Sequence, residues 1–310
     1  MKSLYLNTRK LIAFMGTFLL LVMMGCSGEN ERNDLDTTTS GVLRISVDES
    51  FKPVIDSQIQ VFEALNPKAK IIADYKSEAA CLEDFKTDST KLIIITRGLN
   101  KEEEQYYKKK FSVYPKWSKV ANDGLAIIIN NSDKDSLFTM AKIRGILSGT
   151  TGDKQNAVFD GLEGSSGFRY AQDSILKGVP IDMSRVFGEK SSEDVIEFIE
   201  KNKNVIGFVG VSWIGNAEDT TQLSFLTKVK IGSVLCDCPD NAFVKPYQVN
   251  IMTRRYPMVR GLYYVSKENY SGMATGFSNF LDSERGQLIF RRAYLGPGKM
   301  NFMIRSTTTN

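Results

Sequence analysis

The chain has 310 residues, of which 40 are lysine or arginine, 36 are aspartate or glutamate and none is histidine. The lack of histidine excludes histidine acid–base catalysis and histidine-ligated metal sites. The formal net charge is +4, three of these positive charges fall within the first ten residues, and the remaining +4 − 3 = +1 does not indicate a nucleic-acid-binding surface.

An apolar run follows the first ten residues and ends at Cys26. The order of cations, apolar run and polar stretch predicts an export signal, and the run is shorter than the ~20 residues of a membrane-spanning helix. Gly25 in front of Cys26 resembles the cleavage site of bacterial lipoproteins. We therefore expect a signal peptide over residues 1–25, a lipid on Cys26, a flexible tether over residues 26–41 and a location on the bacterial cell envelope. An uncleaved membrane anchor is the alternative.

The next part of the sequence alternates between strand-like and helix-like segments. Hydrophobic periodicity predicts strand 42–48, helix 51–65, strand 70–76, helix 78–88, strand 91–97 and helix 100–111. This order is typical of a mostly parallel sheet flanked by helices. Ligands bind such sheets beyond the carboxyl ends of the strands, where this sequence has polar or charged residues at 48–50, 77–79 and 96–97.

The rest of the chain continues the pattern less regularly. We expect strands at 123–131, 156–160 and 205–211, helices at 137–149 and 191–201, and a further helix that opens at Ser165 or Ser166. A serine there caps the helix, or the helix start seats an anion, because free N–H groups and the positive end of the helix dipole point outward. The sequence predicts an α/β protein with two lobes.

Three cysteines follow the expected cleavage site, Cys81, Cys236 and Cys238. Three thiols without histidine fall short of a four-ligand zinc site, so we expect no metal. A disulfide between Cys81 and either of the other two is one alternative, and free thiols are the other. Both tryptophans, Trp117 and Trp213, are expected to be buried.

Three segments carry a resemblance to a known family. They are "LFTMAKIRGILSG", "VIGFVGVSW" and, most specifically, "YPMVRGLYYVSKENYSGMATGFSNFLDSERGQLIFRRAYLGP" at 256–297. The chain resembles, over residues 42–298, the phosphate-binding proteins of bacterial ABC importers, which belong to the periplasmic binding class. The resemblance implies a two-lobed, hinged α/β clamp with mixed, mostly parallel sheets. It implies lobe 1 at 42–122 and 245–310, and lobe 2 at 123–244.

The resemblance also implies four ligand-binding loops. Matched position by position, the contacts of that family fall on Ser50, Ser77, Thr96, Arg97, Ser165, Ser166 and Gly167.

Two positions depart from the family pattern. The aspartate of the third loop and the arginine of the fourth are both absent. Arg97 can replace the arginine, because a guanidinium pairs bidentately with a tetrahedral oxyanion; the alternative for Arg97 is a surface ion pair within Glu102–Glu104. Glu49 or Glu78 can replace the aspartate as acceptor of the proton that phosphate carries and sulfate lacks.

These features together predict a lipid-anchored solute-binding protein that captures an inorganic oxyanion, foremost phosphate, and delivers it to an ABC permease. We expect a monomer that needs no cofactor and binds no nucleic acid. The alternative is a surface or sensory lipoprotein of the same fold, used for signalling or adhesion. The sequence has neither a GxSxG motif nor a convincing nucleophile–base pair, which disfavours an enzyme, a histidine-free phosphate-ester hydrolase included.

Overall fold

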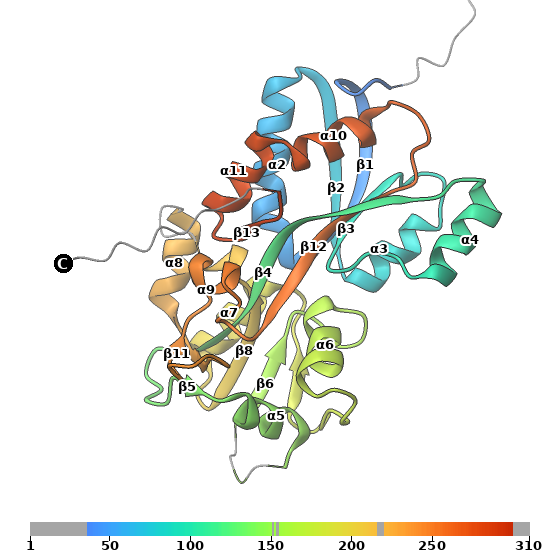
Figure 1. The fold of residues 1–310 in the computed structure, drawn as a ribbon. Coiled ribbons are helices and arrows are strands. Elements are labelled where there is room, and N and C mark those ends of the chain that lie inside the picture. Colours follow the sequence, from blue (N-terminus) through green and yellow to red (C-terminus); the bar gives the residue numbers. More distant parts are fainter. Residues whose placement is uncertain (1–35, 151, 153–154, 216–219, 300–310) are drawn as a thin grey trace, which may run out of the picture. The chain divides into compact units, whose positions relative to one another are not determined.

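The computed structural model describes residues 36–150, 152, 155–215 and 220–299. Residues from Asp36 onward form one compact unit (Figure 1). Cys26 and the expected signal peptide lie outside the described residues. In the described ranges, no helix combines the length and the apolar character needed to cross a membrane.

The first third of the described chain confirms the expected alternation of strands and helices. The elements are β1 (Ser40–Asp48), η1 (Glu49–Phe51), α2 (Lys52–Leu65), β2 (Lys68–Lys76), α3 (Glu78–Phe85), β3 (Leu92–Ile95) and α4 (Lys101–Phe111). The last part of the expected tether belongs to the fold instead, because Thr37 forms a β-bridge with Ser40 and β1 begins at Ser40. Asp36 is held as well, since its carboxylate accepts a hydrogen bond from the Met273 N–H at 3.1 Å.

One long strand, β4 (Lys116–Asn130), links two groups of strands (Figure 1). It begins at Lys116, in a stretch where the sequence predicts no regular structure. Its first half pairs antiparallel with β12 (Val259–Ser266), and its second half pairs antiparallel with β8 (Val205–Gly210) and β9 (Val229–Ile231). The strand order is therefore β2-β1-β3-β12-β4-β8-β6-β7.

The remaining elements are short. Those of the middle of the chain are β5 (Leu137–Phe138), α5 (Met140–Ser148), β6 (Asn156–Phe159), α6 (Ser166–Tyr170), η2 (Ala171–Ile175), β7 (Val186–Gly188), α7 (Ser192–Lys201), η3 (Val211–Trp213) and α8 (Thr220–Lys228). Those near the C-terminus are β10 (Ser233–Leu235), β11 (Phe243–Val244), α9 (Gln248–Met252), α10 (Met273–Asp282), α11 (Glu284–Arg292) and β13 (Gly296–Pro297).

In the strand order, a group of mutually parallel strands lies on each side of β4. β1 is parallel to β2 and β3, and β6 is parallel to β7 and β8. The register pairs Asp48 with Lys76, so β1 and β2 end side by side. Because the carboxyl ends of parallel strands meet at one edge, the residues that follow these strands gather into two sets of loops.

Apolar side chains cover both faces of the strands and hold the carboxyl ends of the strands in place. The strand Leu92–Ile95 is fully buried, as expected of a parallel strand between helices. One apolar cluster joins β1 and β3 to α2, α10 and α11, and another packs α5 and α6 against β6 and β8. The C-terminal helices therefore pack on the strands that open the chain.

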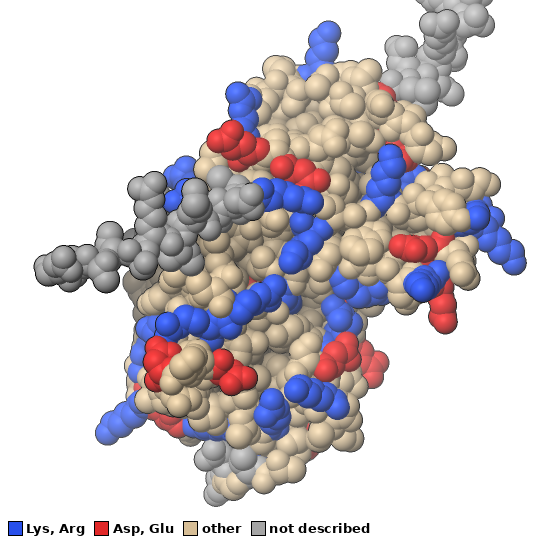
Figure 2. All heavy atoms as spheres, in the orientation of Figure 1, with Lys and Arg blue, Asp and Glu red and all other residues tan. Residues whose placement is uncertain are grey.

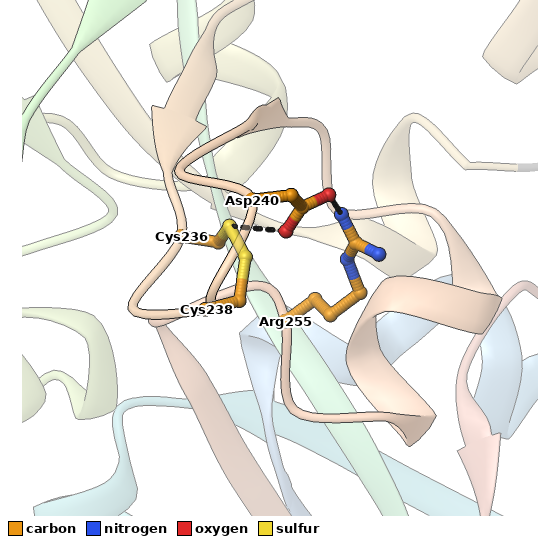
Figure 3. The surroundings of a disulfide bond; sticks show 4 residues. All are labelled: Cys236, Cys238, Asp240 and Arg255. Atoms are coloured by element: carbon orange, nitrogen blue, oxygen red, sulfur yellow. Dashed lines mark hydrogen bonds and ion pairs between the residues drawn. A yellow bond between two sulfur atoms is a disulfide. The ribbon is translucent and has the colours of Figure 1, made fainter.

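The disulfide of this structure joins Cys236 and Cys238, between β10 and β11, with Cα atoms 5.3 Å apart (Figure 3). The alternative in which Cys81 takes part is wrong, because Cys81 is a free thiol buried in α3. Asp240 Oδ1 lies 3.9 Å from Cys236 Sγ, and Asp240 Oδ2 accepts a hydrogen bond from Arg255 at 2.5 Å. Among the described residues, Cys236, Cys238 and Asp240 are the one group close enough to hold a metal, and the disulfide occupies both sulfurs.

The two tryptophans differ in exposure. Trp213 is buried, as expected. The expectation for Trp117 is wrong, because its side chain is 44% exposed. It lies against Gly98, where a Cβ atom would come within 2.8 Å of the indole ring.

Candidate functional site

A group of polar side chains lies where five strands end. Asp48 ends β1, Glu78 follows β2 after one residue, Thr96 follows β3, Asp160 follows β6 and Gly210 ends β8. Asp48, Glu78 and Thr96 are buried. This edge is where open α/β sheets bind their ligands. The sequence analysis placed contacts after the first three strands and in the loop after β6, but it named neither Asp160 nor Gly210.

Arg260, on β12, supplies a buried positive charge to this group. Its Nε donates to Asp123 Oδ2 at 2.8 Å, and its Nη1 donates to the Ser166 hydroxyl at 2.8 Å. The guanidinium also lies over the ring of Phe51, 5.0 Å from the centroid. Burial by itself would lower the pKa of Arg260, but attraction to Asp123 and other nearby carboxylates outweighs burial and raises the pKa. Arg260 is therefore a permanent cation.

Serine hydroxyls at the starts of η1 and α7 surround the carboxylate of Asp160. Ser50 Oγ donates to Asp160 Oδ2 at 2.7 Å, and Ser192 Oγ lies 3.3 Å from the same oxygen. Ser50 Oγ is also 3.4 Å from the hydroxyl of Ser166, the first residue of α6. An internal carboxylate thus sits among hydroxyl groups of the kind that bind oxyanions.

Three polar atoms of this group are buried and have no hydrogen-bond partner in the described structure. They are Asp48 Oδ2, Asp160 Oδ1 and Arg260 Nη2. An unpaired buried polar atom costs about 1 to 3 kcal/mol, so native proteins rarely collect several in one place without a functional reason. One free donor and two free acceptors match a ligand that both accepts and donates hydrogen bonds.

Gly210 lets the backbone come close to this group. A Cβ atom at position 210 would lie 3.1 Å from the Ser50 carbonyl oxygen and 3.3 Å from Arg260 Nη2. Both contacts are tighter than ordinary van der Waals contact, and one involves backbone that cannot easily move. A larger residue at position 210 would therefore displace the unpaired nitrogen of Arg260.

Two carboxyl groups of this region titrate near neutral pH. Burial raises the pKa of Asp48 to about 7, with opposition from Arg260 and support from Glu78 and Asp160. Burial likewise raises the pKa of Glu49 to about 7, and Asp160 adds to the shift. Both groups can therefore exchange a proton under physiological conditions.

Glu49 does not face the unpaired atoms. Its carboxylate accepts hydrogen bonds from the Ser192 N–H at 3.1 and 3.2 Å and from the Ser192 hydroxyl at 2.8 Å. Ser192 is the first residue of α7, so the positive end of that helix favours the charged form of Glu49. Glu49 therefore joins the start of η1 to the start of α7.

A second polar group lies around Glu78. Its Oε1 accepts from the Thr96 N–H at 2.9 Å and from the Thr96 hydroxyl at 2.5 Å, and its Oε2 accepts from Arg169 Nε at 2.6 Å. Arg169 Nη2 donates to Thr96 Oγ1 at 2.7 Å. Burial would raise the pKa of Glu78, but Arg169 and Thr96 outweigh it and lower the pKa. Glu78 is thus an ionised partner of Arg169. The sequence analysis named Glu49 or Glu78 as the proton acceptor, and both oxygens of Glu78 already accept hydrogen bonds from Thr96 and Arg169.

The remaining serines act first as helix caps. Ser165 Oγ accepts from the Phe168 N–H at 3.2 Å and caps α6, while Ser77 Oγ accepts from the Ala80 N–H at 3.4 Å and caps α3. Gly167, in the first turn of α6, faces Asp160, because a Cβ atom there would lie 3.3 Å from Asp160 Oδ1. The capping interpretation is therefore correct for Ser165, and Ser166 is the serine that faces the buried group.

The structure brings together the predicted residues of both polar groups but leaves Arg97 outside them. The Arg97 guanidinium forms two hydrogen bonds with Glu103, at 2.8 and 2.7 Å, and Glu103 also belongs to the capping box at the start of α4. The ion-pair alternative for Arg97 is therefore the arrangement observed. The arginines whose guanidinium groups lie in the two polar groups are Arg260 and Arg169.

We expect Arg97→Ala to leave the affinity for an oxyanion within about threefold of the wild-type value, because partly exposed ion pairs contribute only about 0 to 1 kcal/mol. Calorimetric titration with phosphate measures this change. A loss of tenfold or more would return Arg97 to the binding site. Lys86→Ala, which removes another partly exposed ion pair of this region, is the matched control.

The sequence analysis missed Arg260 and Asp160, although both left a signal. Arg260 is a charged residue inside the strand "VRGLYYVS", where its neighbours alternate toward an apolar core. Asp160 directly follows the strand "NAVF" and so stands at a carboxyl end like Asp48. A search for charges inside or just after apolar strands would have found both.

The sequence matches the PBP superfamily domain over residues 33–285. The chain therefore belongs to the PBP superfamily, and the periplasmic-binding-protein-like α/β fold that the sequence analysis expected is confirmed. No curated protein matches the sequence.

Several solved structures share the fold at low sequence identity. A provisionally assigned phosphate ABC-transporter substrate-binding protein from Clostridium perfringens, solved with bound phosphate, is 20% identical over 83% of this chain and 99% of its own, with a TM-score of 0.68. An ABC-type phosphate transport receptor from Vibrio cholerae is 18% identical over 83% and 100%, with a TM-score of 0.59. The regulatory domain of CcmR from Synechocystis, in complex with 2-PG, is 13% identical over 78% and 96%, with a TM-score of 0.51.

Proposed function

We propose that this protein is a solute-binding protein that captures an inorganic oxyanion, foremost phosphate, at the group formed by Arg260, Asp48 and Asp160. The observation that carries the proposal is the buried Arg260 Nη2, which has no partner and lies in one group with two unpaired carboxylate oxygens. A guanidinium nitrogen in a dry site binds an anionic oxygen strongly. The hydroxyl of Ser166 accepts a hydrogen bond from Arg260 and can turn its own proton toward a ligand in the same group.

The two free acceptors favour phosphate over sulfate. Phosphate carries a proton near neutral pH and can donate it to a carboxylate, whereas sulfate has no proton and would meet the repulsive oxygen of Asp160 and, above the pKa of about 7, that of Asp48 as well. Asp48 and Asp160 replace Glu49 and Glu78 as the acceptors in this proposal, because Glu78 is committed to Arg169 and Glu49 to Ser192. Discrimination of this kind arises because a mismatched ligand leaves buried polar atoms unpaired.

We further propose the arrangement around this site that the sequence analysis expected. Lobe 1 comprises residues 42–122 and 245–310, and lobe 2 comprises residues 123–244. The two lobes close over the ligand. A lipid on Cys26 holds the protein at the cell envelope, and an ABC permease receives the ligand. The fold shared with phosphate transport receptors supports transport. The fold shared with a regulatory domain keeps the sensory alternative open.

Calorimetry of the chain from residue 28 onward tests the proposal. This part contains every described residue, and all its apolar clusters lie after Asp36. We expect phosphate to bind at least a hundredfold more tightly than sulfate. Equal affinities would refute the proton-acceptor role of the aspartates. Binding of neither anion would refute the proposed function and favour the signalling or adhesion alternative.

A further inference from the structure

The end of α4 and the start of β4 carry a surface that the proposed binding site does not use. Residues 106–117 contain four lysines and no acidic residue, although the chain without its first ten residues carries a formal charge of only +1. Figure 2 shows side chains of both signs over α4, because Glu102–Glu104 begin the helix and lysines end it. The positive charge is therefore concentrated at one end of α4.

Exposed aromatic rings lie among these lysines. Tyr114 is 60% exposed, and the Lys108 ammonium lies 4.6 Å from the centroid of its ring. Trp117 is 44% exposed, and its Nε1 donates to Glu104 on α4 at 3.1 Å, so the indole is held in a fixed position. We call Lys108, Tyr114, Lys116 and Trp117 the lysine–aromatic surface. Lys116 is the exposed first residue of β4, directly before Trp117, and forms the edge of this surface.

The described chain begins next to that edge. The Asp36 carboxylate pairs with the Lys91 ammonium at 3.4 Å, and the carbonyl of Lys91 accepts a hydrogen bond from the Lys267 N–H at 3.0 Å. Lys267 follows Ser266, which pairs directly with Lys116 across β12 and β4. The start of the described chain therefore lies at the same end of β3, β12 and β4 as Lys116.

We propose that the lysine–aromatic surface lies against the anionic phospholipid headgroups of the membrane that anchors this protein. The proposal rests on the proposed lipid at Cys26, from which residues 27–35 lead to Asp36. Nine residues reach at most roughly 30 Å, so the start of the fold stays close to the bilayer. Lysines near an anionic membrane are attracted to it, and tyrosine and tryptophan favour the headgroup region, where one side of the ring is apolar and the other is wet.

Sedimentation with lipid vesicles tests this surface without the lipid anchor. The chain from residue 28 onward is mixed with vesicles of phosphatidylcholine alone or with added phosphatidylglycerol. We expect at least about tenfold more binding to the anionic vesicles at low salt, and loss of this binding at high salt because the attraction is screened. Equal binding to both vesicles, or binding to neither, would overturn the proposal, and the second result would favour an acidic protein as the partner of this surface.

A matched pair of triple variants assigns the binding to these residues. Lys108→Glu with Tyr114→Ser and Lys116→Glu changes the surface, whereas Lys201→Glu with Tyr247→Ser and Lys203→Glu makes the same chemical changes at exposed positions elsewhere. We expect the first variant to lose at least about fivefold of the vesicle binding and the second to keep it. Equal loss in both would overturn the assignment.

Phosphate calorimetry on the same variants separates the two proposals. If the surface variant binds phosphate normally and no longer binds vesicles, the surface acts independently of the binding site. If the wild type binds vesicles but not phosphate, the proposed function fails and the membrane surface stands. Mutation of Cys26 in the full chain tests the anchor separately, because Cys26→Ser then releases the protein from the membrane fraction.

Discussion

Arg260→Ala is expected to abolish measurable phosphate binding and to lower the free energy of unfolding by about 3 to 5 kcal/mol. The binding loss follows because Arg260 Nη2 is the unpaired buried donor of the site, and hydrogen bonds to charged groups contribute about 1.5 to 3 kcal/mol each. The stability loss follows because the fully buried Asp123, whose pKa burial already raises, would lose its charged hydrogen-bond partner. Calorimetry and denaturant titration measure the two effects.

A compensated variant separates binding from stability. Arg260→Met combined with Asp123→Asn removes both charges, keeps an acceptor for the Val211 N–H and fills most of the volume of Arg260. Buried ion pairs replaced in this way often cost little stability. We expect this double variant to unfold near the wild-type denaturant concentration and still to bind no phosphate. Phosphate binding by the double variant would contradict the role of Arg260.

The sequence predicts the elements of this fold because local patterns determine them. The strand Leu92–Ile95 is a short continuous apolar run and the helix Lys101–Phe111 begins with a capping box, and both were expected within a few residues. The start of β4 was not expected, because "KWSKVAND" has no clear alternation and is a strand only through its pairing with β12. Pairing between segments distant in sequence leaves no local signal.

The candidate site was predicted only in part, because some of its residues carry a local signal and others are brought in by distant contacts. Ser50 and Ser166 stand at helix starts that the sequence indicates, and the structure places them in one group. The partner of Ser166, by contrast, is Arg260, which is 94 residues away in the sequence. Arg97 was chosen because it lies at a strand end, but Glu103 is six residues away and takes its guanidinium. Sequence neighbours indicate which groups are available, and only the fold decides which of them meet.

The free energy of unfolding of the unliganded protein is expected to fall as the pH rises from about 5 to about 8. The carboxyls of Asp48 and Glu49 have a pKa of about 7 in the folded state, against ordinary values of 3.8 and 4.5. Between these values the folded state binds more protons than the unfolded state, so stability decreases with pH. The stability that the protonated carboxyls of Asp48 and Glu49 contribute is fully present below their unfolded pKa values and is lost as the pH rises past their folded pKa values.

The variants Asp48→Asn and Glu49→Gln test which carboxyl causes this fall. An amide resembles the protonated acid and cannot lose a proton, so Asp48→Asn should be more stable than the wild type at pH 8 by on the order of 2 kcal/mol and should show a flatter pH profile. Glu193→Gln, at an exposed position in the first turn of α7, is the matched control and should keep the wild-type profile. Denaturant titrations at pH 5, 6.5 and 8 compare the four proteins, and a wild-type stability that is constant or rises over this range would contradict the buried protons at Asp48 and Glu49. Because the proton of Asp48 and the proton of phosphate compete for the same small group of oxygens, added phosphate should stabilise the wild type and stabilise Asp48→Asn far less.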